Sequence, residues 1–161
     1  MNKVGETLIH FGENEKIIQA FIDKGVEFVV VGGLAVSWYW PERQVDDLDL
    51  LINPSHENSE RISSVLSSLR FTGFDSSSFT KPALQIPLKR TYYAELLTPL
   101  KEGPSYKEVV KDSIEAKLFE IPVRLASRAS LIQMKKRAII SDPNSSEKHK
   151  KDIERLGENG V

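Results

Sequence analysis

The sequence predicts an α+β fold, in which helices pack against a mixed β-sheet. Two observations lead to this class. Apolar segments of strand length are separated by segments with apolar residues at helical spacing, in the order helix, strand, helix, strand, helix, several antiparallel strands, then helices. The chain has 161 residues and no internal repeat. We therefore expect one domain that spans residues 1–161.

The first half of the chain predicts three helices that alternate with two strands. The apolar spacing of the first helix stops at Gly25, a residue that commonly ends helices. Pro41 ends a short second helix, and Asn53 or Ser55 is suited to cap the third. The continuous apolar run between the first two helices is typical of a buried strand. The expected elements are helices over 13–24, 34–40 and 56–69, with strands over 27–31 and 47–52.

The second half predicts strands followed by two helices. A segment over 71–81 contains Gly73 and a serine run, which indicates a loop or an irregular strand. Two segments then alternate well enough to form a hairpin-like pair, and Pro104 marks a loop near Tyr106. The expected elements are strands over 84–88, 90–97, 113–118 and 122–125, with helices over 127–138 and 147–156.

Composition excludes several classes of function. Lys plus Arg (22) nearly balances Asp plus Glu (23), so overall charge does not predict nucleic-acid binding. The absence of cysteine excludes disulfides and thiolate metal sites. The N-terminus lacks the apolar core of a signal peptide, and no run approaches the ~20 apolar residues that span a bilayer, so we expect a cytoplasmic protein without membrane partners. His10, His56 and His149 share no metal-ligand spacing and are assigned no chemistry.

The most informative segment spans residues 29–52. An apolar strand ends at Gly32 and Gly33, and a second apolar strand carries Asp47 and Asp49. Alternate residues of a strand face the same side, so the two carboxylates lie together, where they repel each other unless a cation separates them. A glycine turn before a helix leaves backbone N–H groups available to a phosphate. This combination indicates Mg²⁺-assisted phosphoryl or nucleotidyl transfer.

The same segment resembles the signature of the nucleotidyltransferase superfamily, which has a polymerase-beta-like fold. That signature places Gly-Gly or Gly-Ser about a dozen residues before Asp-x-Asp, as Gly32–Gly33 and Asp47–Asp49 stand here. Arg43 resembles the arginine that precedes Asp-x-Asp in the small AbiEii-like toxin branch. The sequence departs from the branch at Val45, where threonine is usual, and Gly33 replaces the serine of other branches.

The resemblance continues over about residues 15–156, which would be the core of the domain. The segment around Glu95 resembles the third strand of the family, whose acidic residue completes the metal site. Leu131 to Lys135 matches a Leu-Ile-x-x-Lys pattern, and Lys151 with Asp152 matches a closing Lys-Asp-x-x-x-Leu.

The resemblance implies that Asp47, Asp49 and Glu95 are catalytic residues that bind Mg²⁺, with Mn²⁺ as an alternative. Two other interpretations stay open. The Asp pair also fits incidental acids at an exposed strand end, and Glu95 fits an ordinary strand residue. Most relatives have Asp where this chain has Glu95, so the longer side chain is either accommodated locally or marks a lost catalytic metal.

Nucleotide binding is expected at six residues: Gly32, Gly33, Arg43, Lys135, Lys151 and Asp152. The glycine pair also fits a tight turn that requires a positive φ. Arg43 and Lys135 fit either phosphate contacts or solvated surface residues. Asp152 is expected to orient Lys151 or Lys135 through a salt bridge.

The first functional hypothesis is a Mg²⁺-dependent nucleotidyltransferase, which moves a nucleoside monophosphate from an NTP to a hydroxyl group. The AbiEii resemblance implies an RNA acceptor and a toxin–antitoxin setting with an antitoxin partner. The alternative is a catalytically inactive nucleotide-binding or protein-interaction module of the same fold. A third hypothesis is a subunit whose missing surface comes from another chain.

Overall fold

The structure is a computed structural model that describes residues 3–4, 14–45, 47–88 and 93–158. The described residues form one mixed sheet with strand order β1-β6-β7-β2-β3-β5-β4. The neighbours β2–β7 and β3–β5 are parallel, whereas β2–β3, β6–β7 and β4–β5 are antiparallel. The strands are β1 Lys3–Val4, β2 Phe28–Val31, β3 Leu48–Ile52, β4 Gln85–Pro87, β5 Ala94–Leu97, β6 Ile114–Leu118 and β7 Ile121–Leu125.

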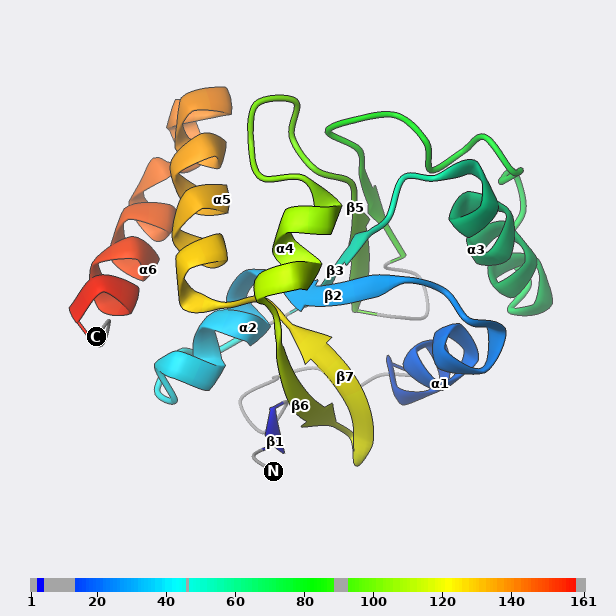
Figure 1. The fold of residues 1–161 in the computed structure, drawn as a ribbon, viewed down its shortest axis with the longest axis horizontal. Helices are drawn as coiled ribbons and strands as arrows, with labels where there is room; N and C mark the ends of the chain where they lie inside the picture. Colours follow the sequence, from blue (N-terminus) through cyan, green and yellow to red (C-terminus); the bar gives the residue numbers. More distant parts are fainter. Residues whose placement is uncertain (1–2, 5–13, 46, 89–92, 159–161) are drawn as a thin grey trace.

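Most helices gather in two groups around this sheet, and α4 lies between the groups (Figure 1). Helices α5 and α6 pack side by side at one end of the molecule and contact α2, whereas α1 contacts α3 at the opposite end (Figure 1). The helices are α1 Asn14–Lys24, α2 Gly32–Tyr39, α3 His56–Ser68, α4 Tyr106–Asp112, α5 Arg128–Ser141 and α6 Ser146–Glu158, with a 3-10 turn η1 over Pro143–Ser145. The predicted α+β class is therefore confirmed.

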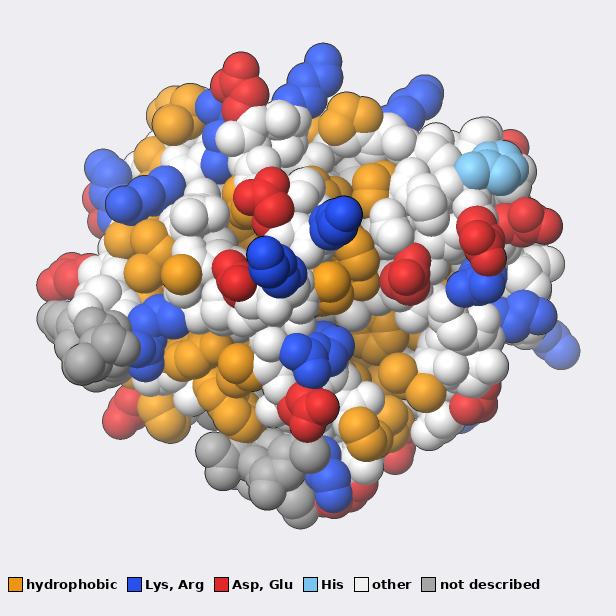
Figure 2. Space-filling model, viewed as in Figure 1, with side chains coloured by type: hydrophobic (Ala, Val, Ile, Leu, Met, Phe, Trp, Pro, Cys, Tyr) orange, Lys and Arg blue, Asp and Glu red, His pale blue; other side chains and the backbone are white. Residues whose placement is uncertain are grey.

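The core lies around β2 and β3, which are neighbours in the middle of the sheet. Val29, Val30 and Val31 are fully buried, as the continuous apolar run predicts for a strand covered on both faces. The outer surface is mixed: Figure 2 shows acidic and basic side chains interspersed on one face. This distribution agrees with the near balance of 22 basic and 23 acidic residues.

Several predicted boundaries differ from the observed ones. The strand predicted over 47–52 begins at Leu48, and the helix predicted from residue 34 begins at Gly32. Of the strand predicted over 90–97, residues 94–97 form β5, while 90–92 lie outside the described residues.

Helix α4 is absent from the prediction, which placed only a loop near Tyr106. The helix begins with a capping box, in which the Ser105 hydroxyl accepts from the backbone N–H of Glu108 and the Glu108 carboxylate accepts from that of Ser105. Ser-x-x-Glu is a recognisable start signal, so this helix is predictable from the sequence.

Candidate active site

The turn between β2 and α2 brings a carboxylate directly against the backbone. Gly32 has φ +68°, a conformation that favours glycine. A Cβ atom at Gly32 would lie 2.1 Å from Asp49 Oδ2, because Val31 and Asp49 are register partners on β2 and β3. Of the glycine pair, only Gly32 has the positive φ that the tight-turn interpretation requires. Gly32 is therefore needed twice, for its backbone angle and for the space that Asp49 occupies.

Replacing Gly32 with alanine is expected to lower the free energy of unfolding by about 2 kcal/mol or more, because the strained φ and the clash with Asp49 add together. Gly73→Ala is the matched control, since Gly73 has φ +89° but no atom within 4 Å of a built Cβ. It should lose only the backbone contribution, about 1–2 kcal/mol. Urea unfolding of both variants measures the difference, and equal losses would refute the close approach of Asp49.

Two acids lie side by side on neighbouring strands. Asp49 on β3 and Glu95 on β5 are register partners, and Asp47 precedes β3 directly. Burial and, to a smaller extent, the charges of Glu95 and Asp47 together raise the pKa of Asp49 to about 7, against the opposing charges of Lys135 and Lys148. Asp49 Oδ1 is buried and has no hydrogen-bond partner among the described residues. These features describe a carboxylate for which burial and neighbouring acids outweigh the positive charges of Lys135 and Lys148.

The acids fit a divalent cation in charge and in donor type. Mg²⁺ prefers carboxylate oxygens and completes its shell with water and substrate phosphates. The buried, unpartnered Oδ1 of Asp49 is the observation that supports this fit. In the part of the chain that is described, however, no three His, Cys, Asp or Glu side chains converge on a single point as they stand.

A buried ion cluster forms the opposite wall. Asp152 is 1% exposed and accepts from Arg43 Nε at 2.9 Å and Arg43 Nη2 at 3.2 Å. Lys135 Nζ lies 3.0 Å from Asp152 Oδ2. Burial opposes ionisation of Asp152, but the hydrogen bonds from Arg43 and the charge of Lys135 outweigh it and lower its pKa. Burial lowers the pKa of Lys135, against the opposing charge of Asp152.

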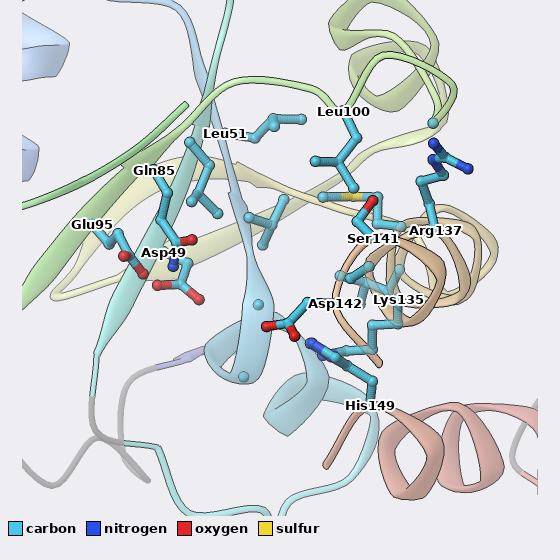
Figure 3. A pocket seen from close by; sticks show the side chains of 18 of the residues that line it. Asp49, Leu51, Gln85, Glu95, Leu100, Lys135, Arg137, Ser141, Asp142 and His149 are labelled. Atoms are coloured by element: carbon cyan, nitrogen blue, oxygen red, sulfur yellow. The ribbon is translucent and has the colours of Figure 1, made fainter. Parts of the chain in front are cut away.

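One cavity of about 790 Å³ joins the acids to these cations. It lies between the sheet and the packed helices α5 and α6, with Asp49 and Glu95 on one side and Lys135 and His149 on the other (Figure 3). Between these polar groups the wall includes apolar side chains, among them Leu51, Leu84, Leu97, Leu100, Leu131 and Met134. The cavity thus presents separate anionic, cationic and apolar surfaces to one ligand.

The structure brings most of the predicted site residues together. The predicted residues that line the cavity are Gly32, Gly33, Arg43, Asp47, Asp49, Glu95 and Lys135. Asp152 lies behind this wall and holds Lys135, one of the two partners expected for it. Asp46, the residue before Asp47, lies outside the described residues.

Lys151 is exposed and does not line the cavity; Lys148 and His149 line it instead. The two stand four and three residues before Asp152 on α6, so they share its helix face. Lys151 is adjacent to Asp152 in sequence and therefore points in a different direction. This spacing was the signal that could have identified His149 and Lys148 from the sequence.

Known structures share the fold of this chain. An antigenic nucleotidyltransferase-like protein from Paracoccidioides brasiliensis matches with a TM-score of 0.54 and 17% identity, over 89% of this chain and 74% of that chain. The solution structure of the antibiotic-resistance factor ANT(2″)-Ia matches with a TM-score of 0.55 and 16% identity, over 89% of this chain and 80% of that chain. The crystal structure of ANT(2″)-Ia with adenylyl-2″-tobramycin matches with a TM-score of 0.53 and 17% identity, over 89% of this chain and 84% of that chain. No protein-family model and no curated protein matches the sequence.

These likenesses establish a nucleotidyltransferase-like fold. The predicted mixed sheet and its helices are confirmed at the level of architecture, and the AbiEii branch is not among the matches described above. Among the described residues, no helix is both long enough and apolar enough to cross a bilayer.

Proposed function

We propose that the protein is a Mg²⁺-dependent nucleotidyltransferase that moves a nucleoside monophosphate from an NTP to a hydroxyl acceptor. One observation carries the proposal: Asp49, whose buried Oδ1 has no hydrogen-bond partner among the described residues, lies beside Glu95 in the cavity that Lys135 and Arg43 also line. The nucleotidyltransferase-like fold supports the same reaction class.

In this proposal Asp47, Asp49 and Glu95 hold Mg²⁺, for which Mn²⁺ can substitute. When bound, the metal neutralises charge on the phosphates and polarises the phosphorus that is attacked. Lys135 and Arg43 face the cavity as fixed positive charges, positioned by Asp152 before the nucleotide arrives. The turn at Gly32 and Gly33 lets the backbone approach the phosphates closely.

Mg²⁺ with NTP is expected to raise the melting temperature much more than NTP with a chelator does. The carboxylates repel a triphosphate, so binding is much weaker without a metal that neutralises them. At 100-fold saturation the stabilisation is about 2.7 kcal/mol, which corresponds to roughly 5–10 °C for a chain of this size. Differential scanning fluorimetry measures the shift, and equal shifts with and without the metal would refute the assignment of the acids.

The acceptor class is tested with two groups of compounds. The AbiEii resemblance supports an RNA acceptor in a cytoplasmic toxin–antitoxin system, with an antitoxin as partner. The cavity of about 790 Å³ also favours a small hydroxyl compound, and ANT(2″)-Ia has been solved with an adenylylated tobramycin. Each α-labelled NTP is incubated with Mg²⁺ and either total RNA or a set of small polyhydroxyl compounds. The labelled product then identifies the acceptor class.

The second candidate is a nucleotide-binding module without turnover. It is favoured by Glu95 at a position where relatives most often have Asp, and by the lack of convergence of three metal ligands among the described residues. A protein that binds NTP with Mg²⁺ but labels no acceptor would support this candidate. Glu95→Asp then tests whether a displaced carboxylate explains the lack of transfer.

A further inference from the structure

His149 lines the cavity at the end formed by α5 and α6. It belongs to α6, is half-buried and lies near Lys135, on the side of the cavity away from Asp49 and Glu95 (Figure 3). Its Nδ1 atom is buried and has no hydrogen-bond partner among the described residues. A neutral imidazole has one donor and one acceptor, whereas the imidazolium has two donors. Protonation therefore leaves this buried nitrogen as a donor without a described partner.

The charges around His149 favour the neutral imidazole in the free protein. Burial lowers its pKa, and the positive charges of Lys135, Lys148 and Arg43 lower it as well, whereas Asp152 alone among these neighbours raises it. Asp152 is already the counter-charge of both Lys135 and Arg43. A proton on His149 would thus add a positive charge to a group of cations that share one buried carboxylate.

An anion in the cavity reverses this balance. A polyphosphate between the cations supplies several negative charges and acceptor oxygens, which offset the repulsion and accept from an imidazole N–H. Asp142 and Glu147 line the same cavity, and the Asp142 carboxylate lies beside the His149 ring (Figure 3), so these acids supply part of the charge that an imidazolium needs and also repel an anion. His149 is therefore suited to gain its charge at the moment of binding.

We propose that His149 is a polyphosphate-binding residue that acts as the imidazolium, so that binding of the anion carries a proton into the protein. The inference rests on the proposed nucleotide site and names a ligand residue to which the sequence assigns no chemistry. It implies that the affinity for polyphosphate rises as pH falls toward the ordinary pKa of histidine, with an upper limit of about tenfold per pH unit for one proton.

The test measures proton uptake directly. Inorganic tripolyphosphate is titrated into metal-free protein at pH 6.5, in two buffers with different enthalpies of ionisation, by isothermal titration calorimetry. Asp49 also titrates near neutrality, with a pKa of about 7, so all proteins carry Asp49→Asn, which removes that source of protons. Protons that tripolyphosphate itself gains or loses on binding contribute equally in every variant, so they cancel in the difference between variants.

We expect the His149 protein to take up as much as one proton more than His149→Gln. His56→Gln, at an exposed position on α3, is the matched control and should retain the full uptake. His149→Lys supplies a permanent cation, so it should bind tripolyphosphate at least tenfold more tightly than His149→Gln and without the extra proton. Thermal melting verifies that each variant is folded.

Two results would overturn the proposal. One is equal proton uptake by the His149 protein and by His149→Gln, and the other is no binding of tripolyphosphate at all. Neither depends on turnover. If tripolyphosphate binds with His149-dependent uptake while no acceptor is labelled, the anion site holds and the transferase proposal fails. If transfer occurs without His149-dependent uptake, the transferase proposal holds and this inference fails.

Discussion

Replacing Asp49 with alanine is expected to abolish nucleotide transfer, with a rate loss of about 10³-fold or more. Nucleotidyl transfer depends on positioning and on neutralising charge in the transition state, and the metal would supply the largest positive charge in this site. Of the three acids, Asp49 is the one with a buried oxygen that has no hydrogen-bond partner among the described residues. Single-turnover assays with labelled NTP measure the loss.

The matched control is Asp75→Ala, which removes an exposed carboxylate that accepts hydrogen bonds from serines of its own turn. It should leave the rate within about twofold of the wild-type value, since surface changes far from a site have small effects. A transfer rate that survives in Asp49→Ala and falls in the control would remove Asp49 from the proposed site.

Asp49→Asn should at the same time stabilise the metal-free protein at alkaline pH. The pKa of Asp49 is about 7 in the folded protein, whereas its ordinary value is 3.8. The folded state therefore binds a proton on Asp49 more tightly than the unfolded state does. The contribution of Asp49 to stability is therefore most favourable below pH 3.8, declines as pH rises to about 7 and is constant above it. Asparagine does not titrate, so the variant should lack this decline.

The expected gain for Asp49→Asn is a few kcal/mol at pH 8 and much less at pH 4, because each unit of pKa difference corresponds to about 1.36 kcal/mol. Urea unfolding in chelator at the two pH values measures it. A variant less stable than wild type at pH 8 would show that Asp49 has a counter-charge.

The second large effect is expected from Asp152→Asn, which should lower the free energy of unfolding by about 3–5 kcal/mol. The change leaves Arg43 and Lys135 as buried cations without their shared carboxylate, and breaking a buried ion pair costs more than the pair itself contributes. The pKa of Asp152 is below its ordinary value, so its stabilising contribution is present above the unfolded pKa and is lost as pH falls through the folded one.

Urea unfolding at pH 7 measures this loss, and Glu57→Gln on α3 is the control. Glu57 pairs with Arg61 at 2.7 Å, but both side chains are exposed, so the loss there should be under about 1 kcal/mol. Adding Lys135→Met to Asp152→Asn should recover part of the stability, because it removes one of the two unpaired cations. Equal losses in the two single variants would mean that the cluster is open to solvent.

The sequence by itself determined the local elements of this protein. The apolar run of β2, the Asp-x-Asp at β3 and the helical spacing of α1 and α3 each depend on side-chain period over a few residues, and that period is visible without the fold. The same holds for the glycine pair, because a strand that turns at once into a helix needs a residue that tolerates positive φ. The capping box of helix α4 is also a local pattern, so this helix was predictable although the sequence analysis placed only a loop there.

Only the tertiary structure decided how these elements form a site. The register of β3 against β5 puts Asp49 beside Glu95, and the packing of α6 on α5 brings Asp152 to Lys135. Arg43, which is 109 residues from Asp152 in sequence, follows α2, a helix that α6 also contacts. The same packing turns His149 toward the cavity and Lys151 away from it. Strand register and helix rotation are set by contacts between distant segments, and each shifts a side chain to another face when it changes by one residue. Such contacts have no period in the sequence, so the contact of Asp49 with Glu95 and that of Asp152 with Arg43 are set by the folded chain.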